Sequence, residues 1–124
     1  MNDNTIFTPA PAVHEIIYQQ LGGRKFMVMT GSKNLLYSAK ENNWLSMRLT
    51  RNKSGATYLK IILTDRDDYT MIFSKTVKTF ETLPLSGKKI CINERLETVR
   101  SIAGVYDDTL QSVFTEVTGL YTHL

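Results

Sequence analysis

The sequence has few of the residues that build disulfides and metal sites. Its 124 residues include one cysteine, two histidines and three prolines. A single cysteine cannot form an internal disulfide, and this favours a reducing compartment. A metal site needs three or four convergent ligands, and the two histidines are far apart in the sequence. We therefore expect no disulfide scaffold, no metal and no cofactor.

Long apolar runs are also missing. No stretch of roughly eighteen apolar residues occurs, and the N-terminal segment MNDNTIFTPAP has no basic start followed by a long apolar part. These features argue against a membrane-spanning helix and a secretion signal, so we expect a cytoplasmic protein without a membrane partner. The net charge of +3 is mild. It permits a polyanionic partner but does not require one.

No group of residues indicates catalysis. The glycines of Leu21–Lys25 precede an expected strand, whereas phosphate-binding loops precede a helix. Asp65, Asp67 and Asp68 form the densest acidic cluster but lack the glycine and distal glutamate of a calcium loop, so we interpret them as a polar turn. Cys91 lies between two isoleucines, where a cysteine packs as a small hydrophobe. We expect no enzyme; a metal-dependent hydrolase at the aspartates is the least favoured alternative.

Two helices are expected, one near each end of the chain. The first would begin at Thr8 and Pro9 and end at Gly22-Gly23. Its apolar stripe is Val13, Ile16, Ile17 and Leu21. The second would be capped by Asp107 and Asp108, with Gln111 completing a capping box, and would end at Gly119. Its stripe is Leu110, Val113, Phe114 and Val117.

Between the helices, the pattern is typical of antiparallel strands. Apolar and polar residues alternate in several runs bounded by turn residues. The expected strands are 25–30, 35–38, 44–51, 57–64, a run beginning at 69, 89–93 and 97–103. The segment 79–89 contains Pro84 and Gly87, and we expect an exposed loop or hairpin excursion there. Residues 1–8 are expected to be a flexible lead, and residues 9–124 a single domain.

The predicted fold class is α+β, an antiparallel meander of five or more strands with both helices packed on one sheet face. The opposite face would then be open. On our register it carries Ser46, Arg48, Thr50, Tyr58, Lys60, Ile62, Thr70 and Ile72. Such a mixture can stack bases and neutralise phosphates. The alternatives are an ordinary solvated face, a face covered by residues 79–100, or a homodimer interface.

Four segments resemble a known family. The motifs are LGGRKFMVMTGSKNL from Leu21 to Leu35 and the terminal GVYDDTLQSVFTEVTGLYT from Gly104 to Thr122, with YLKIILT and DYTMIF between them. In these the chain resembles a family of small uncharacterised proteins of bacteriophages and other mobile elements. The resemblance covers most of the chain from Ile16 onward, but the chain carries extra residues between Lys75 and Glu97. The family has no assigned active site to carry over.

The resemblance implies a phage-type accessory protein acting in the host cytosol. We expect a non-enzymatic binder of a host or phage macromolecule, such as an inhibitor of a host defence system of the anti-CRISPR kind. The alternative is a single-stranded nucleic-acid-binding module that uses the open sheet face. The candidate partner-binding residues are Arg48, Arg51, Lys53, Tyr58, Lys60, Lys88 and Lys89.

Overall fold

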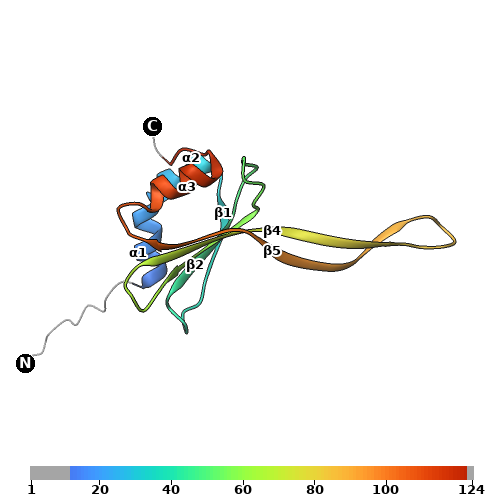
Figure 1. Ribbon diagram of the computed structural model, residues 1–124, viewed down its shortest axis with the longest axis horizontal. Helices are drawn as coiled ribbons and strands as arrows, with labels where there is room; N and C mark the ends of the chain where they lie inside the picture. Colours follow the sequence, from blue (N-terminus) through green and yellow to red (C-terminus); the bar gives the residue numbers. More distant parts are fainter. Residues whose placement is uncertain (1–11, 123–124) are drawn as a thin grey trace, which may run out of the picture.

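A computed structural model describes residues 12–122 and contains one five-stranded antiparallel sheet, with strand order β1-β2-β3-β4-β5. Three helices lie on one face of this sheet, and two strands continue far beyond it as an arm (Figure 1). The elements are α1 Val13–Leu21, α2 Arg24–Thr30, β1 Lys33–Tyr37, β2 Trp44–Arg48, β3 Tyr58–Leu63, β4 Tyr69–Thr82, β5 Lys89–Val105 and α3 Leu110–Thr118. The α+β meander predicted from the sequence is confirmed. The predicted lead, residues 1–8, lies outside the described residues, and so do Thr8 and Pro9, where the first helix was predicted to begin. In the described residues α1 begins at Val13, after an extended Ala12.

The first helix forms where its apolar stripe predicts. Ile17 and Leu21 of α1 are fully buried, and Gly22 ends the helix with a φ of 119°. The start of α1 has no side-chain cap from its own N-cap residue. Instead, the backbone N–H of Val13 donates to Asn42 Oδ1, 3.0 Å away in the loop between β1 and β2. This bond satisfies one of the free N–H groups of the helix start and ties α1 to the sheet.

The second helix corrects a prediction. Residues 25–30 were expected to be a strand, but α2 is a helix flanked by Gly23 and Gly31, both with positive φ. Its burial follows a helical period, because Phe26 and Thr30 are buried while Val28 is 74% exposed. A strand would have placed Phe26, Val28 and Thr30 on the same face. Because most residues of this segment are apolar, the helical period cannot be recognised in the sequence.

The body of the sheet follows the predicted alternation. The inward residues of β2, β3 and β4 are buried: Leu45, Met47, Leu59, Ile61, Tyr69, Met71 and Phe73. The three helices cover this side of the sheet. Phe114 of α3 is central, since its ring meets Phe26 edge to face at 4.9 Å between centroids and lies 6.5 Å from Phe73. Aromatic pairs of this geometry add to the energy of their burial.

The terminal helix forms as predicted, but its predicted capping box is wrong. Gly119 ends α3 with a φ of 76°, and Leu110, Phe114 and Val117 are buried. The N-cap residue is Thr109, and no side chain makes a cap hydrogen bond. Gln111 instead faces α1, where its Nε2 donates to the carbonyl oxygen of Gln20 at 3.1 Å and its Oε1 accepts from Thr122 at 2.8 Å. Gln111 therefore links the last turn of α1 to the segment that follows α3.

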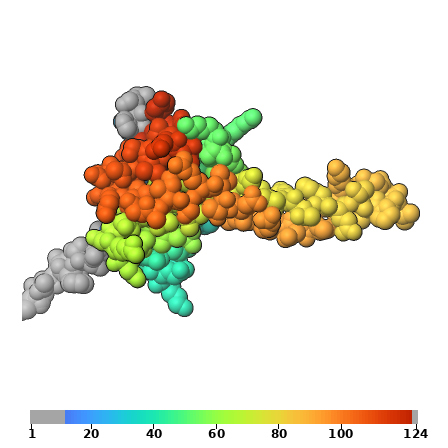
Figure 2. Space-filling view, viewed as in Figure 1, coloured from blue at the N-terminus to red at the C-terminus, as the bar shows by residue number. Residues whose placement is uncertain are grey.

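The exposed hairpin excursion, one of the two alternatives expected at residues 79–89, forms as the end of a longer arm. The two short strands expected at 89–93 and 97–103 are one continuous strand, β5. The pairing of β4 with β5 begins at the pair Tyr69 and Val105 and continues to the pair Thr82 and Lys89. β5 has 17 residues against 14 in β4, and the pairing shifts register at three places, each adding one residue to β5. Such bulges bend a ribbon and increase its twist. Figure 2 shows the arm, in yellow and orange, as a narrow projection from the body.

Candidate partner-binding surface

The sheet face opposite the helices carries the residues that the sequence places there, except Thr50, which follows the end of β2. Three cross-strand rows cross β2, β3 and β4: Trp44–Ile62–Thr70, Ser46–Lys60–Ile72 and Arg48–Tyr58–Ser74. Paired residues point to the same side of a sheet, so these side chains share one surface. Arg48 and Lys60 are exposed, whereas Tyr58, Ile62 and Ile72 are half-buried. The face is therefore mixed, with cations at its surface.

Lys60 and Trp44 form the most specific contact on this open face. The Lys60 Nζ lies 4.5 Å from the centroid of the Trp44 ring, within the range of a cation–π interaction. The indole Nε1 of Trp44 is buried and has no hydrogen-bond partner within residues 12–122. The ammonium group of Lys60 thus lies over the Trp44 ring, so the ring is only partly available to a stacking ligand.

The seven candidate partner-binding residues do not form a single cluster. Arg48, Tyr58 and Lys60 share the open face. Arg51 and Lys53 lie in the loop between β2 and β3, and the backbone N–H of Lys53 donates to the carbonyl of Thr118 at 3.1 Å. This loop adjoins the base of the arm, because the Thr57 N–H donates to the Ser74 carbonyl. The remaining two, Lys88 and Lys89, lie at the arm tip, far along β4 and β5.

The arm exposes a large apolar surface that the sequence analysis did not assign. Its exposed large apolar residues are Phe80, Leu83, Leu85, Ile90, Ile92, Leu96 and Val99. Phe80 is 55% exposed and Leu96 59% exposed. Both lie on the face that continues the open sheet face, because the residues of β4 alternate without interruption from Ser74 to Phe80. In the sequence, this apolar surface is indicated only by several apolar residues in a segment that has no helical stripe.

Two glutamates in the middle of the arm partly offset its cations. Glu97 forms ion pairs with Lys75 Nζ at 3.7 Å and with Arg95 Nη2 at 3.5 Å, and Lys78 lies directly opposite Glu94 in the register. Exposed ion pairs of this kind contribute little to stability. The cations outnumber the glutamates here, so the middle of the arm keeps a small positive charge between its apolar side chains.

Cys91 corrects another prediction. It was expected to pack as a small hydrophobe, but it is exposed and lies opposite Phe80 on the arm. Its Sγ–H donates to the carbonyl of Asn93 at 3.3 Å. The isoleucines on either side belong to a two-stranded ribbon with no core beneath it, so alternation does not imply burial here. His14 lies in α1 and stacks on Tyr37 with ring centroids 3.6 Å apart.

The aspartate cluster between β3 and β4 has the geometry of a polar turn. The Thr64 N–H donates to the Asp68 carbonyl at 2.8 Å, and Asp67 has a φ of 64°. Within residues 12–122, no group of three His, Cys, Asp or Glu side chains is placed to hold a metal ion. Aspartate favours such turns because its side chain bonds the local backbone and tolerates a left-handed conformation.

One ionisable group beside this turn is clearly perturbed. Tyr69 is almost fully buried at the start of β4, and its hydroxyl donates to Gln20 Oε1 at 2.7 Å. Burial raises the pKa of Tyr69, and the negative charges of Asp107 and Asp67 raise it further. Tyr69 thus stays neutral and links the sheet to α1.

No protein-family model, curated protein or solved structure matches this chain. Among the described residues, no helix is long and apolar enough to cross a membrane.

Proposed function

We propose that this protein is a non-enzymatic binding protein that docks onto a partner protein through the β4–β5 arm. The observation that carries the proposal is the apolar surface of the arm, where Phe80 and Leu96 stay more than half exposed on a ribbon without a core. Exposed apolar groups gathered on one element are typical of docking surfaces, and aromatic residues often anchor such interfaces. Lys78 and Glu94, paired in register between Phe80 and Leu96, place charges of opposite sign on this stretch of the arm.

The biological setting comes from the resemblance to phage and mobile-element proteins. It suggests a partner in the host cell or in the phage, and an inhibitor of a host defence complex of the anti-CRISPR kind fits a small binder with an extended arm. Such a protein works by occupying a surface, so it needs shape and apolar contact rather than catalytic groups. The arm supplies both in a form that can enter a groove or lie along a sheet edge of the partner.

The test is recovery of a stoichiometric partner from phage-infected host cells with tagged protein. A double variant, Phe80→Ser with Leu96→Ser, removes the apolar anchors, and both changes lie on exposed positions that leave the core intact. The matched control is Val28→Ser, which removes an exposed apolar side chain from α2 on the body. We expect the double variant to lose the partner and the control to keep it. Equal recovery by all three proteins would contradict the proposal.

A second function has one observation in its favour, which is the grouping of Arg48, Tyr58 and Lys60 on the open face. Cations beside aromatic side chains bind single-stranded nucleic acid by neutralising phosphates and stacking bases. Binding of a labelled oligothymidine at low salt, weakened in Arg48→Ala with Lys60→Ala, would support this function. Each lost phosphate contact should reduce the slope of log affinity against log salt by about 0.7. No binding at low salt would exclude it.

A further inference from the structure

The charges of this chain are separated along its long axis. Residues 75–100 hold six of the lysines and arginines and three glutamates, whereas the rest of the sequence holds nine basic and nine acidic residues. The arm therefore accounts for the whole net charge of +3. At the opposite end of β4 and β5, the turns 64–68 and 106–109 hold five aspartates and one arginine. The molecule has a basic arm and an acidic end.

The tip of the arm is an ordered turn with free cations. The Leu83 N–H donates to the Lys88 carbonyl at 2.8 Å, and the Gly87 N–H donates to the Leu83 carbonyl at 2.9 Å. Leu85 at the apex is fully exposed. Neither Lys88 nor Lys89 forms an ion pair with any residue of the described range 12–122. The tip thus carries one fully exposed apolar side chain in an ordered turn and two ammonium groups where that turn leads into β5.

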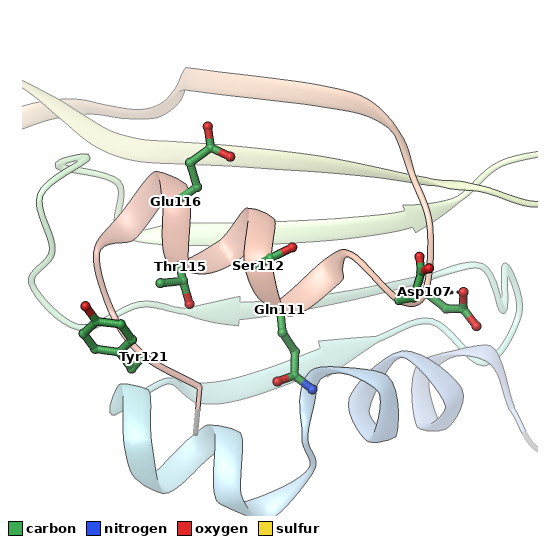
Figure 3. A pocket seen from close by; sticks show the side chains of 7 residues that line it. Asp107, Gln111, Ser112, Thr115, Glu116 and Tyr121 are labelled. Atoms are coloured by element: carbon green, nitrogen blue, oxygen red, sulfur yellow. Dashed lines mark hydrogen bonds between the residues drawn. The ribbon is translucent and has the colours of Figure 1, made fainter. Parts of the chain in front are cut away.

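The acidic end carries a groove of about 700 Å³ along the exposed side of α3. Its lining residues are Asp107, Asp108, Gln111, Ser112, Thr115, Glu116 and Tyr121. Figure 3 shows Asp107 before the start of α3 and Tyr121 beyond its end, with Glu116 on the helix between them. Tyr121 is 70% exposed, so the groove has an aromatic wall as well as carboxylates. None of its carboxylates is paired with a cation of the described residues.

The tip and the groove of one chain cannot meet. At roughly 3.3 Å per residue, the 14 residues of β4 span on the order of 45 Å between the acidic end and the arm tip. The basic tip also lies well beyond one Debye length, about 8 Å in physiological salt, from the acidic end of its own chain. Any pairing of these two surfaces must therefore join different copies.

We infer that copies of this chain associate head to tail, with the arm tip of one copy seated in the α3 groove of the next. Lys88 and Lys89 would lie against Asp107, Asp108 and Glu116, while Leu85 would lie against Tyr121. The two surfaces differ, so the contact is heterologous and repeats from copy to copy, giving rings if it closes and filaments if it does not. The contact uses only the tip, so Phe80 and Leu96 stay free, and the inference does not depend on the proposed function.

The test is the molar mass of the whole chain in solution, measured by sedimentation or light scattering from micromolar to millimolar concentration. At roughly 0.01 M salt, where the Debye length is about 30 Å, the mass should rise with concentration beyond that of a dimer. At roughly 1 M salt, where the Debye length is about 3 Å, it should fall toward that of one chain. A mass that stays at one chain, or stops at an isologous dimer, would overturn the inference.

Reciprocal charge reversal separates this contact from general electrostatic attraction. Lys88→Glu with Lys89→Glu should abolish association, and so should Asp108→Lys with Glu116→Lys. Combining all four changes should restore it, because the tip and the groove are complementary again. The control Lys25→Glu with Lys40→Glu changes the net charge as the tip variant does, at exposed positions outside both surfaces, and should still associate. Failure of the combined variant to associate, or loss of association in the control, would contradict the assigned contact.

Discussion

The ring of Phe26 meets the ring of Phe114 edge to face, with centroids 4.9 Å apart and planes inclined by 69°. This contact joins α2 to α3 over the buried side of the sheet. It exists only because residues 24–30 form a helix, which turns Phe26 inward and leaves Val28 in solvent. The packing of the two helices thus depends on a segment whose sequence looks extended.

Truncation of Phe26 should therefore destabilise the domain strongly. Phe26→Ala removes a fully buried ring, and such changes cost about 3–5 kcal/mol. Val28→Ala, two residues away and 74% exposed, should change the free energy of unfolding by less than about 0.5 kcal/mol. Urea unfolding of both variants measures the difference. Similar losses for the two would contradict the helical assignment of α2.

Gln111 should matter more than the aspartates before α3. Gln111→Ala removes the bonds to the Gln20 carbonyl and Thr122, and we expect a loss of about 1–3 kcal/mol because two part-buried hydrogen bonds are lost. Asp108→Ala should have little effect, since its side chain makes no cap bond. Thermal unfolding compares the two variants. A larger loss for Asp108→Ala would favour the capping box after all.

Tyr69 should make the domain sensitive to alkaline pH. Its pKa in the folded state is raised above the unfolded value of about 10, so the stability it contributes is present below pH 10 and is lost as the pH rises above it. Tyr69→Phe removes this ionisation together with the bond to Gln20. The wild-type free energy of unfolding should therefore fall more steeply above about pH 10 than that of the variant. Parallel slopes for the two proteins would rule out Tyr69 as the source.

The arm should be dispensable for the fold of the body. No residue from Lys75 to Arg100 is buried, so replacing residues 77–95 by an Asn-Gly turn removes no core side chain. We expect the melting temperature to change by less than about 8 °C, corresponding to about 1 kcal/mol or less. Circular dichroism during heating tests this. Unfolding of the shortened protein at room temperature would show that the arm contributes to the domain's stability.

The sequence predicts those parts of the fold that bury one face of an element. The stripe of α1 and the alternation of β2, β3 and the first half of β4 were read correctly, because one side of each is in the core. The outer half of the arm has no buried side, so its apolar and polar residues do not need to alternate and the strands cannot be recognised from a pattern. A bulge at Ile92 further broke the alternation of β5. For α2, seven residues between two glycines were too few for the helical period to stand out from an apolar run.

The candidate site was predicted in part for the same reason. Arg48, Tyr58 and Lys60 were placed together on the open face, because the register of β2 and β3 follows from their buried residues. The apolar arm and the acidic groove were missed. Phe80 and Leu96 lie in different strands, and only the long pairing of β4 with β5 brings them onto one surface. The groove likewise joins residues from both ends of α3, with Tyr121 beyond its last turn.

Photo-crosslinking from Cys91 tests the central claim most directly, because this thiol is the only one in the chain and lies exposed beside Phe80. The natural protein would be labelled there with a maleimide crosslinker, and a Cys91→Ser, Lys40→Cys variant would carry the same label on the body. In infected host cells, the arm label should give one discrete protein adduct that is lost with Phe80→Ser and Leu96→Ser. The body label should give much less of it. An adduct that forms equally from both positions, or that persists without the two apolar anchors, would contradict docking through the arm.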